Sequence, residues 1–345
     1  MDTLDEIHES VQDYYGKVLG GSEDLKTNAC CSLDEIPEHL QKLLRNIEPE
    51  VLERFYGCGA PLPAAIDGCT VLDLGCGTGR DLFLASALVG ESGRVIGVDM
   101  TDEQLEVARR CLPKQMARYG YASPNVTLHK GYIEDLQSVG IEDNSVDVVI
   151  SDCVINLSSN KEQVFHEALR VLKPGGELYF SDVVSDRRLP QHLMNDPELL
   201  GECLSGAMYH EDFRRLMARL GCPDVRKMSS SRISINSPDI EAKMGMAKFY
   251  SVTYRIFNLE SLEDRCEDYG QVACYDGSIP EYPHEFKLDD HHVFETEKPV
   301  LVCGNTASML AETRFARHFR VEGDRTTHVG LFDCGEGICD SESCC

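Results

Sequence analysis

Hydrophobic residues gather in short runs along the middle of the chain, and longer amphipathic stretches separate these runs. The runs at 70–74, 94–99, 126–131, 146–152 and 177–182 are rich in valine, leucine and isoleucine, which is typical of buried parallel strands. Strands that alternate with helices predict a parallel sheet with crossover helices, so we expect a doubly wound α/β domain. Helices are expected at 36–55, 82–88, 102–119, 161–172, 199–203 and 210–220, and further strands at 225–235 and 249–257. Pro49 is expected to break or kink the first of these helices.

The pattern differs on either side of this α/β domain, which we place at 63–260. Residues 1–62 carry helical patterns and end at a Pro-rich connector, so we interpret them as an N-terminal helical arm. Residues 261–332 form short, charged segments, which predict a small α+β domain with a helix at 309–319. The Cys-rich end of the chain, 333–345, is expected to be a mobile tail, because termini without core-forming residues are rarely ordered.

The turn after the first strand carries a distinct chemical signal. Gly75, Gly77 and Gly79 lie between a buried strand and a helix, where a ligand can approach bare backbone. The next strand ends in Asp99, whose carboxylate can accept hydrogen bonds from both hydroxyls of a ribose. The dinucleotide fingerprint spaces its glycines differently, and Asp73 would repel a pyrophosphate but could hold an ammonium group. The pattern therefore predicts an adenosine ligand that carries an amine.

This combination resembles the class I S-adenosylmethionine-dependent methyltransferases, whose cofactor carries an amine and a sulfonium. The resemblance implies a Rossmann-like sheet and S-adenosylmethionine as the cofactor. In such sheets the ligand lies beyond the carboxyl ends of the strands. Ile133 and Glu134 follow the third strand, so they could clamp the adenine by packing and by accepting a hydrogen bond from its amine.

Charge and composition exclude several classes of partner. The chain has 345 residues, 42% of them hydrophobic, and a net charge of −26 from 33 basic and 59 acidic side chains. That excess repels phosphate backbones and anionic lipid, so we expect no nucleic acid, no membrane and a small methyl acceptor. We find no run of 18 apolar residues and no signal peptide, and therefore expect a cytoplasmic protein, which we take to be a monomer.

Sixteen cysteines are an unusual number for a chain without a secretory signal, and none of them forms a Cys-x-x-Cys pair. In a reducing compartment we expect mostly thiols. Cys153 follows the fourth strand, where methyltransferases of this class meet the acceptor. Cys58 and Cys203 have few apolar neighbours in sequence, which favours exposure and reactivity. Most of the cysteines in or beside apolar segments are assigned to packing; these cysteines are Cys69, Cys76, Cys111, Cys222, Cys266, Cys274 and Cys303.

Four cysteine-containing segments make the resemblance more specific, because they look like the four cysteine motifs of arsenite methyltransferases. These segments are 24–30, 56–59, 151–157 and 201–203. That family's cofactor motifs match 75–81, 97–101 and 131–134. The likeness covers roughly 10–260 and continues more faintly through 314–319.

The resemblance implies that Cys58, Cys153 and Cys203 bind arsenic(III) and that Cys30 is the redox partner thiol, although the adjoining Cys31 could also serve. It implies arsenite and methylated trivalent arsenicals as substrates, and thioredoxin or glutathione as the external reductant. Many relatives carry asparagine where this chain has Asp152. The cofactor-binding residues expected are Tyr56, Asp73, Gly75, Gly77, Gly79, Asp99, Met100, Ile133, Glu134 and Asp152.

The chemistry of arsenic agrees with this hypothesis, because soft centres select thiolates. Three thiolates would hold arsenic with its lone pair free to attack a sulfonium methyl group, which is mainly a positioning effect. Two alternatives stay open at this point. One is a class I methyltransferase that acts on an organic acceptor, and the other is a thiol-rich metalloid-binding protein without enzymatic activity.

Overall fold

The computed structural model describes most of the chain, namely residues 36–55, 57, 59–194, 196, 199 and 203–333. Several predictions therefore fall outside the described residues. They concern Cys30, Cys31, Tyr56 and Cys58, most of the arm over 1–62, most of the helix expected at 199–203, and the tail beyond residue 333.

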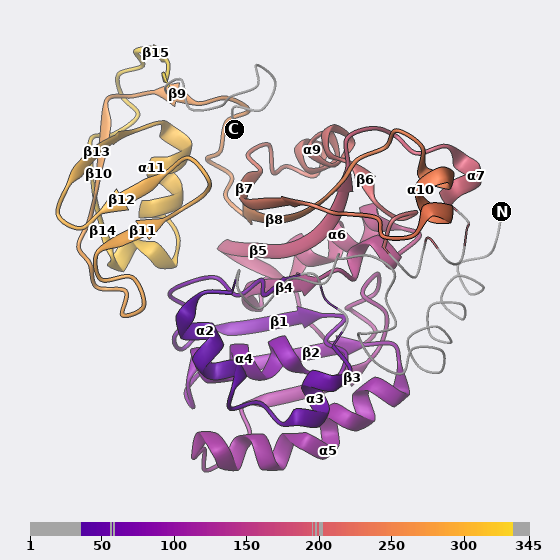
Figure 1. The fold of residues 1–345 in the computed structure, drawn as a ribbon. Helices are drawn as coiled ribbons and strands as arrows, with labels where there is room; N and C mark the ends of the chain where they lie inside the picture. The colour runs from indigo at the N-terminus through magenta and orange to yellow at the C-terminus, as the bar shows by residue number, and fades with distance from the viewer. Residues whose placement is uncertain are drawn as a thin grey trace.

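A mixed sheet of eight strands forms the centre of the described structure (Figure 1). Its order is β3-β2-β1-β4-β5-β8-β7, with the short β6 paired to β5. The strands from β3 to β5 run parallel, whereas β8 pairs antiparallel with β5 and with β7. The strands are β1 (Thr70–Leu74), β2 (Arg94–Asp99), β3 (Val126–Lys130), β4 (Val146–Asp152), β5 (Leu172–Ser185), β6 (Met208–Tyr209), β7 (Arg226–Arg232) and β8 (Phe249–Phe257).

Helices cover both faces of this sheet, which confirms the predicted doubly wound α/β class. One face packs against α2 (Glu38–Leu44), α3 (Pro49–Glu53), α4 (Arg80–Val89) and α5 (Asp102–Tyr119). The other packs against α6 (Lys161–Val171) and α9 (His210–Arg219). The strand order reverses direction between β1 and β4, so the carboxyl ends of these strands open a crevice for a ligand. In the described part of the chain, every helix is too short or too polar to cross a lipid bilayer.

The C-terminal unit has its own aromatic core, built around Tyr275, Phe286 and Phe315. A buried ion-pair network fastens it to the sheet, because Glu177 on β5 pairs with Arg255 on β8 and with Arg314 of the C-terminal unit. Its elements are β9 (Glu267–Asp268), β10 (Gln271–Tyr275), β11 (Glu285–Lys287), β12 (Val293–Glu295), β13 (Pro299–Val302), α11 (Gly304–Ala311), η5 (Arg314–Arg317), β14 (Phe319–Glu322) and β15 (Gly330–Leu331).

The helix expected at 36–55 breaks at Pro49, as predicted: it forms two short helices, and Pro49 begins the second, where its missing N–H costs nothing. Two other local predictions were wrong in detail. The helix expected at 309–319 begins earlier, at Gly304, because the side chain of Cys303 caps it by accepting from the Thr306 amide. Strand β5 was expected to begin at Glu177, but it extends back to Leu172, through the Pro-Gly-Gly sequence at which the preceding helix was expected to end.

Candidate active site

The glycine turn between β1 and α4 has the shape that the sequence predicts. Gly75 has φ +69°, and a Cβ there would lie 2.3 Å from the side chain of Val154, so only glycine fits. Gly79, with φ +98°, caps the first turn of α4. A hydrogen bond of 2.9 Å from Thr78 Oγ1 to the backbone oxygen of Val51 ties the turn to α3. The turn is therefore fixed from both sides and presents backbone to the crevice.

Asp99 lies at the end of β2 and organises the backbone of this turn. Its Oδ2 accepts from the Gly77 amide at 2.9 Å, and its Oδ1 accepts from the Thr101 amide at 2.8 Å. Burial raises the pKa of Asp99, and these hydrogen bonds oppose that effect. Asp99 also lines the pocket, so its carboxylate lies within reach of a ligand that enters there.

Asp73 lies on β1, and its carboxyl group is buried. Its Oδ2 has no hydrogen-bond partner among the described residues. Burial raises its pKa well above the usual range, and the nearby charges of Asp81, Asp152 and Asp99 raise it further. A buried, unpaired carboxylate is costly, and such groups normally meet a partner. An ammonium group would satisfy both the empty acceptor and the charge.

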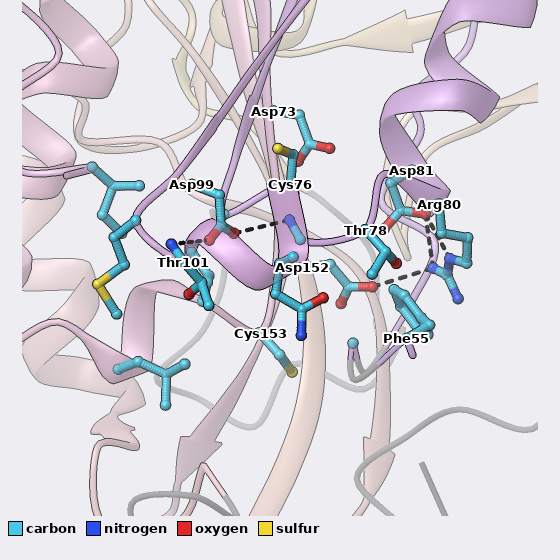
Figure 2. Close-up of a pocket in the computed structure, with 18 of the residues that line it drawn as sticks. Phe55, Asp73, Cys76, Thr78, Arg80, Asp81, Asp99, Thr101, Asp152 and Cys153 are labelled. Atoms are coloured by element: carbon cyan, nitrogen blue, oxygen red, sulfur yellow. Dashed lines mark hydrogen bonds and ion pairs between the residues drawn. The ribbon is translucent and has the colours of Figure 1, made fainter. Parts of the chain in front are cut away.

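Arg80 is a site residue that sequence reasoning did not assign, although its place in the glycine motif marked a departure from the dinucleotide spacing. It is buried, donates from Nε to Asp81 Oδ1 at 2.9 Å, and lies 3.3 Å from Asp152 Oδ2. Its guanidinium stacks on the ring of Phe55, 3.3 Å from the ring centre. Figure 2 shows Arg80 between Asp81 and Phe55, with Asp152 directed toward it.

One pocket opens at the carboxyl ends of the parallel strands β1 to β4. Ile133 and Glu134, the residues predicted to hold adenine, line it together with Met100 and Tyr132. Glu134 is held in place by a hydrogen bond from the hydroxyl of Ser158, which caps the short helix η4 (Ile155–Leu157). The structure thus brings every described residue of the predicted cofactor set, except Gly79, into the lining of one pocket.

Cys153 and Cys203 lie together, although β5 and several helices separate them in sequence. The Cys203 Sγ is 3.6 Å from the backbone oxygen of Cys153. Both residues have φ +57°, a left-handed conformation that costs energy for any residue with a side chain. Cys153 also lines the cofactor pocket and is disulfide-bonded, whereas Cys203 forms no disulfide.

The expectation that Cys203 is exposed was wrong, since only 6% of it is accessible. It belongs to an apolar cluster with Leu204 and Val183, and this cluster also contains Leu193 from α7 (Gln191–Met194) and Ile240 from α10 (Pro238–Met244). Val183 and Ile240 are distant in sequence, so the residues next to Cys203 gave no sign that these side chains cover it. The thiol therefore lies in a site with little access for water.

Two further ionisable groups lie near this cluster, and sequence reasoning missed both. Lys161, at the start of α6, donates to the backbone oxygen of Ser158 at 2.7 Å, and burial lowers its pKa to about 8. Burial raises the pKa of Asp182, on β5, to about 7. Lys161 thus lies close enough to Asp182 and to Cys203 for the charges of both to act on it.

Most cysteines assigned to packing do pack. Cys76, Cys111, Cys222, Cys274 and Cys303 are buried free thiols, and Cys69 is half-buried. Cys266 is buried but disulfide-bonded, so the reading of this residue as a packing thiol was wrong.

The negative charge of the pocket lining suits a cationic adenosine ligand. Its lining carries Asp73, Asp81, Asp99, Asp152 and Glu134 against two arginines. S-adenosylmethionine carries an ammonium, a sulfonium and one carboxylate, so its net charge is positive. The unpaired Asp73 carboxylate and the bare glycine turn are the features that such a molecule requires. The residues present therefore fit this cofactor.

Comparisons with known proteins identify both parts of the chain. A family model described as a methyltransferase domain matches residues 66–221, and one described as the arsenite methyltransferase C-terminal domain matches residues 269–343. A crystal structure of an arsenic(III) S-adenosylmethionine methyltransferase from Chlamydomonas reinhardtii superposes with a TM-score of 0.84 at 51% sequence identity, over 86% of this chain and all of that one.

Curated relatives extend this match over nearly the whole sequence. An arsenite methyltransferase from Aquipseudomonas alcaligenes is 54% identical over 96% of this chain and 96% of its own length. The human arsenite methyltransferase is 41% identical over 92% of this chain and 84% of its own length. The family's activity leaves no place for the two alternatives considered above, an organic acceptor and a protein that only binds metalloids. The chain belongs to the arsenite methyltransferase family, whose members use S-adenosylmethionine to methylate arsenic.

Proposed function

We propose that the thiolates of Cys58, Cys153 and Cys203 hold the arsenic(III) that this protein methylates. The observation that carries the proposal is the 3.6 Å contact between Cys203 Sγ and the backbone of Cys153, at the edge of the cofactor pocket. Cys58 is the residue between Gly57 and Gly59, and Gly57 lines the same pocket. Three segments that are remote in sequence thus supply the three sulfur ligands.

The cofactor would be held mainly through charge and hydrogen bonds. Asp73 would bind its ammonium, Asp99 the ribose hydroxyls, and Ile133 with Glu134 the adenine. When bound, S-adenosylmethionine supplies an electrophilic methyl group on a sulfonium. The remaining proposed contacts come from Tyr56, Gly75, Gly77, Gly79, Met100 and Asp152.

The environment of the thiols suits arsenic better than a hard metal ion. Arsenic(III) is soft and prefers thiolates to oxygen ligands. The apolar cluster around Cys153 and Cys203 excludes water that would compete for arsenic. The left-handed backbone at both cysteines supports a functional role, because strain of this kind persists mainly where a site requires it.

The redox balance of the reaction requires further thiols. Transfer of a methyl group to the arsenic lone pair leaves arsenic formally pentavalent. Two electrons return it to the trivalent state, and two thiolates supply them when they join in a disulfide. The disulfide bond at Cys153 supports the use of this residue in such a step. We propose Cys30, or the neighbouring Cys31, as the partner thiol, and thioredoxin or glutathione as the reductant that resets the pair.

We further propose arsenite and methylated trivalent arsenicals as the substrates, and a monomer in the cytoplasm as the working form. The net charge of −26 supports a small-molecule acceptor, because it repels nucleic acid and anionic lipid.

The test is methyl transfer from labelled S-adenosylmethionine to arsenite and to methylarsonous acid, with thioredoxin as reductant. The wild-type protein should methylate both. A variant with Cys30→Ser and Cys31→Ser should lose the reaction with arsenite and keep that with methylarsonous acid, which needs only two thiolates. Cys69→Ser, half-buried and outside the pocket, is the control. Full activity of the double variant on arsenite would rule out the redox role.

A further inference from the structure

Arg80 joins three parts of the molecule through one side chain. Nη2 donates to the backbone oxygen of Gly59, Nε donates to Asp81 on α4 at 2.9 Å, and Nη2 lies 3.3 Å from Asp152 Oδ2. The face of the guanidinium rests on Phe55. The arm, the first turn of α4 and the end of β4 therefore meet at this residue.

Asp152 closes the same arrangement from the other side. Its Oδ2 accepts from the Gly59 amide at 3.3 Å, so Arg80 and Asp152 bind the carbonyl and the amide of one residue. A Cβ at Gly57 would lie 2.2 Å from Asp152 Oδ2. At Gly59, a Cβ would lie 2.6 Å from Ser181 Oγ. A side chain at either position would displace these groups, so the backbone of both glycines lies directly against side chains of β4 and β5.

A general contribution to stability does not explain this arrangement well. Burial of an arginine and its carboxylates costs about as much as the ion pairs return. Lysine could carry the charge but could not donate in a planar fork and stack on a ring at the same time. The pair binds the backbone on one side of Cys58, and Asp152 directly precedes Cys153. Its position therefore links two of the proposed arsenic ligands.

We propose that Arg80 and Asp152 form a clasp that holds Gly59, the neighbour of Cys58 in sequence, so that Cys58 can join Cys153 and Cys203 around arsenic. Arg80 is then a positioning residue that sets substrate range. Inorganic arsenite, which needs three thiolates, requires the clasp, whereas methylarsonous acid, which needs two, does not. This inference rests on the proposed role of Cys58.

The experiment measures kcat/KM for arsenite and for methylarsonous acid in Arg80→Met, Arg80→Lys and Phe55→Leu. The ratio of the two values should fall in Arg80→Met by about 10- to 100-fold, since a displacement near 1 Å can cost that much. Arg80→Lys should lose nearly as much, and Phe55→Leu less, because it keeps the ion pairs. Cofactor affinity, measured by calorimetry, separates this role from direct cofactor binding.

Binding without turnover gives a second readout. Affinity for arsenite should fall in Arg80→Met, and affinity for phenylarsine oxide, which takes two thiols, should stay within about threefold of wild type. Cys58→Ser is the benchmark and should change both ratios in the same direction. If Cys58→Ser changes neither, the proposed ligand set fails. If Cys58→Ser changes both ratios and the Arg80 and Phe55 variants change neither, the clasp proposal fails. It also fails if the Arg80 and Phe55 variants weaken the reactions with both arsenicals equally, or if they weaken cofactor binding to the same extent.

Discussion

The cofactor pocket and the thiol site share one edge of the sheet, but they are built in different ways. The pocket comes from neighbouring motifs: the glycine turn, Asp73 before it and Asp99 at the end of the adjacent strand, joined by short backbone hydrogen bonds. The thiol site comes from remote segments, with Cys153 after β4 and Cys203 held by an apolar cluster that includes α7 and α10. One half depends on local geometry, and the other depends on tertiary packing.

This difference separates the effects expected from mutation. Changes in the pocket should alter cofactor affinity and leave arsenic binding intact, whereas changes among the cysteines should do the reverse. Arg80 and Asp152 are exceptions, since they line the pocket and yet contact Gly59 next to Cys58, and Cys153 belongs to both sites.

The largest effect is expected from Cys153→Ser or Cys203→Ser. Serine nearly matches the thiol in size but offers a hard oxygen ligand, so methylation of every trivalent arsenical should fall below detection. Cofactor affinity in calorimetry should stay unchanged in Cys203→Ser. If either variant retained methylation of methylarsonous acid, the replaced cysteine would not be one of the arsenic ligands.

Asp73→Asn should act on the other half with two effects of opposite sign. It removes the charged partner of the cofactor ammonium, which should weaken S-adenosylmethionine binding about 10- to 100-fold, for a charged hydrogen bond of about 1.5–3 kcal/mol. It should also stabilise the protein without cofactor, because a buried carboxylate with no partner is costly. Calorimetry and thermal melting measure the two effects separately.

The gain in stability from Asp73→Asn should depend on pH in a defined direction. Burial raises the pKa of Asp73 in the folded protein, so the folded state binds this proton more tightly than the unfolded chain. The ionised group therefore costs stability above the raised pKa, and this cost shrinks as the pH falls toward the ordinary value of an aspartate. Melting curves of variant and wild type should converge at low pH. A difference that grows on acidification would contradict this account of Asp73.

The smallest effect is expected from deletion of residues 334–345, which carry Cys334, Cys339, Cys344 and Cys345. The maximal rate with arsenite should stay at the wild-type level, because the proposed ligands and relay thiols lie elsewhere. A modest rise in the arsenite concentration for half-maximal rate would indicate that the tail captures arsenite. Loss of the maximal rate would extend the thiol site into the tail.

The contrast between the two halves also explains what the sequence could predict. The strands, the glycine turn and the carboxylates of Asp73 and Asp99 follow from periodicity and from adjacent residues, and the structure confirms their placement. The burial of Cys203 depends on α10, which arrives from a distant part of the chain, so its polar neighbours in sequence predicted exposure instead.

The sequence did not reveal which side chains connect separate helices and strands, for the same reason. Arg80 departs from the dinucleotide spacing, but nothing in the motif reveals its contacts with Phe55 and Gly59. The proximity of Lys161 to Asp182 joins a helix start to a strand interior, and no spacing rule connects them. The early start of α11 depends on a cap from Cys303, a residue type that seldom caps helices.

X-ray absorption at the arsenic edge tests the ligand set most directly, because it counts the atoms bound to arsenic without requiring turnover. Arsenite bound to the reduced wild-type protein should show three sulfur ligands and no oxygen. Cys58→Ser should show two sulfurs and one oxygen, and Cys69→Ser should match the wild type. Oxygen-dominated coordination in the wild type, or three sulfurs retained in Cys58→Ser, would contradict the proposal that Cys58, Cys153 and Cys203 hold the arsenic.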